Sequence, residues 1–135
     1  MSFGVSAALQ KSVYQALIGS VDLSSAVGGA IFDAAPSGQI PELYVSLGPE
    51  IVRERSDIGV DGARHEFTVS VVASRGGFSS AKEIAVLVND ILSGANLVLE
   101  RGSLIFLRFL KAVAKPETAE GRRIDMIFRA RVDDI

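Results

Sequence analysis

"HEFTVSVVASRGGFSSAKEIAVLVNDIL", residues 65–92, combines a strand pattern, a glycine turn and a helix pattern. From Glu66 to Ser74 polar and apolar side chains alternate, with Val72 as the one exception, which is the period of a strand with one buried face. Gly76 and Gly77 then interrupt the strand. Ser80 and Glu83 have the spacing of a capping box, so we expect a helix to begin there and to end before Gly94.

The segments on either side of this stretch supply the remaining elements. The first is an amphipathic helix over 5–18, closed by Gly19 and followed by a short turn that Asp22 caps. Strand patterns then occupy 30–32, 43–47 with an extension over 51–55, 104–113 and 123–132. We therefore expect one α+β domain over residues 1–135, with an antiparallel sheet, two main helices on one face and the order α-β-β-β-α-β-β.

The strand pattern after the second helix, "SLIFLRFLKAVAK", is apolar on both faces. Strict alternation predicts two sets, one with Leu104, Phe106, Leu110 and Ala112, the other with Ile105, Leu107, Phe109 and Val113. We expect one face to pack under the helices and the other against a neighbouring chain or a second layer of the same chain. Leu107 and Phe109 are therefore candidate interface residues.

The last strand pattern, "RRIDMIFRARVDD", has one apolar face and one charged face. Arg123, Arg129 and Arg131 lie on the charged side. One interpretation is that they meet acidic groups of another subunit or of a neighbouring protein. The alternative is an ordinary solvated sheet face.

The composition gives little support for catalysis. The chain has 135 residues, a net charge of -2 and no cysteine, which excludes disulfides and cysteine-ligated metals. His65 is the only histidine and no zinc or nucleophile-elbow motif occurs, so we expect no catalytic, cofactor or metal site. "GGFSS" lacks the lysine of a phosphate-binding loop and is better explained as a turn with a helix cap.

The mean hydropathy of +0.34 is high for so small a domain and indicates apolar surface that other chains cover. No segment approaches the roughly 20 apolar residues that span a bilayer, and the first residues do not resemble a signal peptide. We therefore expect a protein that is made in the cytosol of its host cell and does not contact a membrane.

Charge is divided between the two halves of the sequence. Basic residues predominate over 101–131, whereas acidic residues predominate over 1–63. A nucleic-acid-binding surface would explain the basic end, although no aromatic pair typical of RNA-binding strands occurs. A solvated sheet face is the plain alternative. A third explanation is head-to-tail contact between identical chains, which closes a ring when the rotation permits.

Five segments carry a resemblance to a known family: "SAALQKSVYQAL", "GAIFDAAPSG", "PELYVSLGPE", "HEFTVSVVASRGGFSSAKEIA" and "RRIDMIFRARVDD". Together they resemble the tail-terminator, or tail-completion, proteins of gene transfer agents and long-tailed phages. The resemblance implies a subunit of a ring, usually hexameric, on the head-proximal end of a tail tube. Such a ring stops tube growth and joins the tube below to the neck or stopper protein of the DNA-filled head above. The resemblance also implies that the particle is assembled in the bacterial cytoplasm. DNA would pass through the ring without sequence-specific binding.

Residues 53–63 form the tip of a long hairpin between two strands, and we call this segment the arm. In a ring around DNA, an acidic tip at Glu54, Asp57 and Asp61 would repel phosphate and face the lumen. Alternatively, the arm clasps a tube protein or a neighbouring subunit and buries Ile58 and Val60. A mobile exposed turn is the third interpretation.

A function from another class also fits the sequence. A small ligand-binding or nucleic-acid-binding module could use the basic face of the C-terminal hairpin and would equally lack a catalytic set. An enzyme with carboxylate chemistry is a third and weaker alternative. Association under native conditions distinguishes a ring-forming protein from both.

Overall fold

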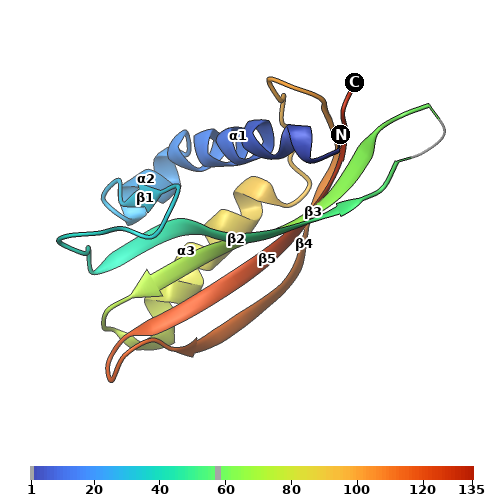
Figure 1. Cartoon of the computed structure of the whole chain (residues 1–135). Helices are drawn as coiled ribbons and strands as arrows, with labels where there is room; N and C mark the ends of the chain where they lie inside the picture. The colour runs from blue at the N-terminus through green and yellow to red at the C-terminus, as the bar shows by residue number, and fades with distance from the viewer. Residues whose placement is uncertain (1, 57–58) are drawn as a thin grey trace.

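The computed structural model describes residues 2–56 and 59–135 and contains one five-stranded sheet with helices packed on one face (Figure 1). The elements in chain order are η1 (Ser2–Val5), α1 (Ser6–Ile18), α2 (Val21–Ala26), β1 (Ile31–Phe32), β2 (Leu43–Glu54), β3 (Gly62–Ala73), α3 (Gly77–Leu92), β4 (Ser103–Pro116) and β5 (Arg122–Asp133). The predicted α+β fold is confirmed, and the order of its elements is close to the predicted one.

The sheet has the strand order β1-β2-β3-β5-β4. The three contacts among β2, β3, β5 and β4 are antiparallel, as expected, but β1 runs parallel to β2 and makes the sheet mixed. β1 has only two residues, so its sequence contains no pattern from which a direction could be predicted. β4 lies at the edge opposite β1 and has one strand neighbour, β5.

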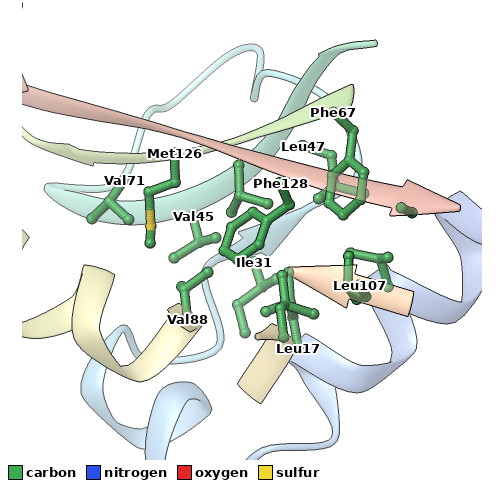
Figure 2. Packing of buried hydrophobic residues seen from close by; sticks show 14 of the residues in the cluster. Leu17, Ile31, Val45, Leu47, Phe67, Val71, Val88, Leu107, Met126 and Phe128 are labelled. Atoms are coloured by element: carbon green, nitrogen blue, oxygen red, sulfur yellow. The ribbon is translucent and has the colours of Figure 1, made fainter. Parts of the chain in front are cut away.

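Phe128 of β5 lies at the centre of the core, between the sheet and the helices (Figure 2). Its ring stacks on Phe67 of β3 at a centroid distance of 5.8 Å and meets Phe109 of β4 edge-on at 5.9 Å. Buried side chains of α1 and α3, including Leu17 and Val88, cover this layer from the helix side. Such aromatic pairs add to the stability that apolar burial provides.

The helix ends differ from the predicted ones. α3 begins at Gly77, after Gly76 as its N-cap, and no side chain caps it, so the predicted start at Ser80 is wrong. Gly76 and Gly77 both have positive φ angles, which let the chain turn from β3 directly into the helix. α2 is capped by Ser20, whose Oγ accepts a hydrogen bond from the backbone N–H of Leu23, and not by Asp22.

Two register shifts in β4 change which of its residues share a face. They fall between Leu104 and Phe106 and between Phe109 and Lys111, and each adds one residue against β5. A single inserted residue moves every later side chain to the opposite face. As a result, the strict alternation predicted for this strand is wrong. Leu104, Leu107, Phe109, Ala112 and Ala114 pair with core residues of β5, whereas Phe106, Arg108, Lys111 and Val113 pair with residues of the open face.

A partly buried polar cluster joins the start of α1 to the sheet. The carboxylate of Glu50 lies 3.2 Å from Nδ1 of His65, which is wholly buried, and accepts a hydrogen bond of 2.6 Å from Oγ of Ser6. Burial alone would raise the pKa of Glu50, but the hydrogen bonds from His65 and Ser6 outweigh it and the pKa lies below its ordinary value. His65 therefore has a structural position inside the core.

Leu107 and Phe109 should respond differently to substitution by Asp. Leu107 is 2% exposed, so Leu107→Asp places a carboxylate in the core and should lower the free energy of unfolding by roughly 3 kcal/mol or more. Phe109 is 41% exposed, so Phe109→Asp should leave the subunit folded with a much smaller loss. Urea denaturation followed by circular dichroism measures both. Equal midpoints for the two variants would contradict the placement of β4.

The Glu50 cluster predicts an acid-dependent loss of stability. A carboxyl whose pKa is lowered on folding stabilises the protein above its unfolded pKa, and this stabilisation is lost as the pH falls through the folded pKa. Glu50→Gln should therefore be less stable than the parent protein by roughly 1–2 kcal/mol near neutral pH. The difference should shrink below the ordinary value of 4.5. Urea titrations across this range give the comparison, and a difference that does not change with pH would refute the assignment.

Candidate assembly surface

The face of the sheet that points away from the helices is basic. Strand pairing places its side chains in rows across β2, β3, β5 and β4, for example Ile51, Glu66, Arg129 and Arg108. The basic residues of this open face are Arg53, Arg64, Arg108, Lys111, Lys115, Arg123, Arg129 and Arg131, and its acidic residues are Glu66, Asp125 and Asp133. No helix covers this face in the described part of the chain (Figure 1).

Positive charge is in excess near the base of the arm. Glu66 accepts hydrogen bonds from Arg129, at 3.1 Å to Nε and 2.8 Å to Nη2, while Nε of Arg64 lies 4.0 Å from the same carboxylate. Desolvation, followed by repulsion from Arg55, Arg129 and Arg53, lowers the pKa of Arg64 from its ordinary value. The carboxylate of Glu66 is thus the acidic partner of both Arg129 and Arg64, while the neighbouring arginines repel Arg64.

A second ion-pair network lies at the other end of the open face. Arg123 donates to Asp125 at 2.8 Å and lies 3.2 Å from Glu117, and Lys115 lies 3.2 Å from Asp125. Burial would raise the pKa of Asp125, but hydrogen bonds from Ser70 and Arg123 lower it below its ordinary value. The network links side chains of β3, β5 and β4 across this end of the open face.

The three arginines that the sequence singled out all have acidic partners in their own chain. Arg123 pairs with Asp125, Arg129 with Glu66, and Arg131 with Asp133 at 3.3 Å. These pairs form within one chain and occur without a second subunit. The expected contact with acidic groups of another chain stays a prediction.

The outer half of β4 is an exposed apolar edge. Leu107 packs in the subunit's own core and its side chain is not accessible to another chain. From Phe109 to Pro116 every residue is exposed, including the apolar Leu110 and Val113. Unpaired edge strands and exposed apolar clusters are both typical of surfaces that bind other chains. Of the two predicted interface residues on β4, Leu107 and Phe109, only Phe109 has a side chain that reaches this surface.

An open groove of about 360 Å³ runs between α3 and the outer half of β4. Its floor is apolar, with Ile124 and Met126 of β5, and its walls contain Val86 of α3 and Phe109 and Ala112 of β4. Lys82 and Asn89 also line it. We call this feature the α3–β4 groove. This groove was not predicted from the sequence, although Val86 is an apolar residue outside the buried stripe of α3, which is a signal that periodicity can detect.

The arm is a continuation of the β2–β3 hairpin that projects beyond the body of the domain (Figure 1). The backbone N–H of Arg55 donates to the carbonyl of Gly62, and Asp134 donates from its backbone to Asp61. Glu54 and Asp61 are exposed and Val60 is partly buried. Asp57 and Ile58, which the sequence analysis also assigned to the arm's function, lie outside the described residues.

The described residues were compared with the requirements of a metal site, a phosphate-binding loop and a membrane-spanning helix. Among residues 2–56 and 59–135, no three His, Asp or Glu side chains are grouped as a metal site requires. "GGFSS" forms the start of α3, with glycines that set the turn. In the same described residues no helix has both the length and the apolar character that a bilayer crossing demands.

Comparison with known proteins identifies the family. No curated protein sequence gave a significant match. A chain of a solved structure described as "virion of native gene transfer agent (GTA) particle" is 49% identical, covers 98% of this chain and 99% of its own length, and superposes with a TM-score of 0.91. A second solved structure, 19% identical over 97% of this chain and 94% of that chain, has a TM-score of 0.53 and shares the fold. The family model for tail completion protein gp17 matches residues 11–133, and the chain therefore belongs to the tail completion protein gp17 family.

Proposed function

We propose that this protein forms a ring, usually hexameric, that caps the head-proximal end of a tail tube in a phage-like particle. The ring stops growth of the tube and joins it to the neck or stopper protein of the DNA-filled head. The family assignment supports the tail role, since it covers nearly the whole chain and its members are described as tail completion proteins.

The observation that carries the proposal is the near-complete match to a chain of a gene transfer agent virion. At 49% identity and a TM-score of 0.91, the two chains share their fold from end to end, with no inserted domain that could add another activity. We transfer to this protein the location that the virion structure implies, a phage-like particle assembled in the bacterial cytoplasm. Its role there is structural and not enzymatic.

Ring formation is supported by the surfaces of the subunit. β4 leaves one edge of the sheet unpaired, with exposed apolar side chains on it, and this chain offers no strand of its own among the described residues to cover that edge. A heterologous contact through such an edge repeats around an axis and closes when the rotation permits. The partners are then identical subunits, the tube protein below and the neck or stopper protein above.

Two further surfaces receive roles within this proposal. Arg123, Arg129 and Arg131 belong to a basic sheet face that could bind acidic groups of a neighbouring protein, in addition to their partners in the same chain.

The arm fits either of two positions in the ring. It faces the lumen, where Glu54, Asp57 and Asp61 repel DNA, or it clasps a neighbour through Ile58 and Val60.

The alternative function is a small ligand-binding or nucleic-acid-binding module. The specific observation in its favour is the open basic face, where Arg64 and Arg129 share Glu66 as their acidic partner and Arg53 adds a further positive charge near Arg64. Binding of DNA through such a face would weaken steeply as salt is added. The proposed ring requires no such binding, because DNA only passes through it.

Deletion of the gene from a bacterium that produces the particle tests the proposed function. We expect DNA-filled heads without joined tails, and tubes that lack a defined head-proximal end, because nothing stops their growth. Electron microscopy of purified particles and a DNA-transfer assay measure both effects. Reintroduction of the intact gene serves as the control.

Normal particles with joined tails of uniform length after deletion would contradict the proposal. Salt-sensitive binding of duplex DNA by the purified protein, lost in an Arg64→Glu, Arg129→Glu double variant, would favour the nucleic-acid-binding alternative instead.

A further inference from the structure

We infer that the open face of the sheet contacts the phosphates of duplex DNA in the channel of the ring, through an arginine cluster near the base of the arm. The cluster comprises Arg53 of β2, Arg64 of β3, Arg129 of β5 and Arg108 of β4. This inference rests on the proposed ring and goes beyond it, because a ring that only joins a tube to a neck protein does not need to bind DNA.

Strand pairing sets these arginines side by side on one face. Arg53 pairs directly with Arg64, and Arg64 pairs with Arg131. In the next row of the same face, Arg129 pairs with Arg108. Like charges directly opposite each other on a sheet destabilise the pairing of its strands. The folded sheet therefore retains a repulsion that a bound anion would relieve.

Carboxylates of the same chain neutralise only part of this charge. Glu66 lies 2.8 Å from Arg129 and 4.0 Å from Arg64, so it is shared between them. In the described part of the chain, Arg53 and Arg108 form no ion pair. The guanidinium of Arg108 lies instead over the ring of Phe106, at 4.3 Å from its centroid. Two guanidinium groups of the cluster are thus available to an external anion.

The open face is the better candidate for the channel wall. The contact proposed for β4 uses an edge of the sheet and leaves this face uncovered (Figure 1). On the helix side, the exposed charges of α3 are Lys82, Glu83 and Asp90, which give no positive excess. Glu54 pairs with Ala63, which is buried in the core, so Glu54 lies on the helix side as well and DNA at the open face would not meet it.

Duplex DNA fits the cluster by its chemistry and by the symmetry of a ring. Guanidinium groups bind phosphate through paired N–H donors, and such contacts are independent of base sequence. DNA on the axis meets the same cluster of every subunit, so weak contacts add. A single subunit offers few of them, and the assembled ring is therefore the form that we expect to hold DNA.

Cleavage from a tethered iron chelate tests the contact, because the natural chain has no cysteine. Ile51 is 53% exposed and pairs with Glu66 on the open face, so Ile51→Cys places the label beside the cluster. Iron–EDTA on this cysteine would be activated with ascorbate and peroxide in purified, DNA-filled particles. We expect cuts in the packaged DNA several-fold above those in particles of the natural sequence. Val86→Cys, on the helix side and 58% exposed, is the matched control and should give background only.

A second variant tests the arginines themselves. Arg53→Gln, Arg108→Gln removes two charges without leaving a carboxylate unpaired, so the subunit should stay folded. Combined with Ile51→Cys, it should reduce the cuts in DNA several-fold, because each lost phosphate contact weakens binding. Lys11→Gln, Lys82→Gln removes the same charge from the helix side and should leave the cuts unchanged.

Cuts in the tube or neck protein in place of DNA would overturn the inference in favour of an acidic protein on the open face. Background cleavage from Ile51→Cys would also overturn it, as would cuts that Arg53→Gln, Arg108→Gln does not reduce. In each case the proposed function stands if the labelled particles keep joined tails and gene deletion leaves tails unjoined. The two failures can therefore be told apart.

Discussion

Among the described residues β4 is hydrogen-bonded to a strand on one side only, and the assembly that we propose depends on that asymmetry. The inner side of β4 pairs with β5 along its length, while the outer half from Phe109 onward remains exposed. Phe109 belongs to both the core and the exposed surface, since its ring packs edge-on against buried Phe128 and also lines the α3–β4 groove. The hydrophobic core therefore fixes the position of the surface that we propose other subunits bind.

The alternating strands and the amphipathic helices could be predicted from the sequence, because each carries a clear period in residues such as Val69 and Val88. Which side chains of β4 share a face could not be predicted. The bulges depend on the pairing with β5, and an apolar run of sequence contains no signal for their positions. The start of α3 was misplaced because a glycine turn set by Gly76 overrides the Ser80 cap. The ion pair of Arg129 with Glu66 required the register of β3 with β5, which the sequence does not contain.

The groups that stabilise the subunit and the surface that we propose for assembly overlap at Phe109 and otherwise differ. The Glu50 cluster and the aromatic stack around Phe128 lie within the subunit, whereas Leu110 and Val113 of β4 contribute apolar surface that the isolated chain does not bury. Single surface ion pairs contribute little, about 0–1 kcal/mol, so the charge pattern directs subunits into the correct orientation more than it holds them. Apolar burial along the outer half of β4 would supply most of the affinity.

A high-resolution electron cryomicroscopy reconstruction of the head–tail junction in purified particles tests the central claim most directly. Our account predicts a closed ring of this chain at the head-proximal end of the tube, in which the exposed outer half of β4 contacts the next copy. A junction that lacks this chain, or a ring in which the outer half of β4 faces solvent, would contradict it.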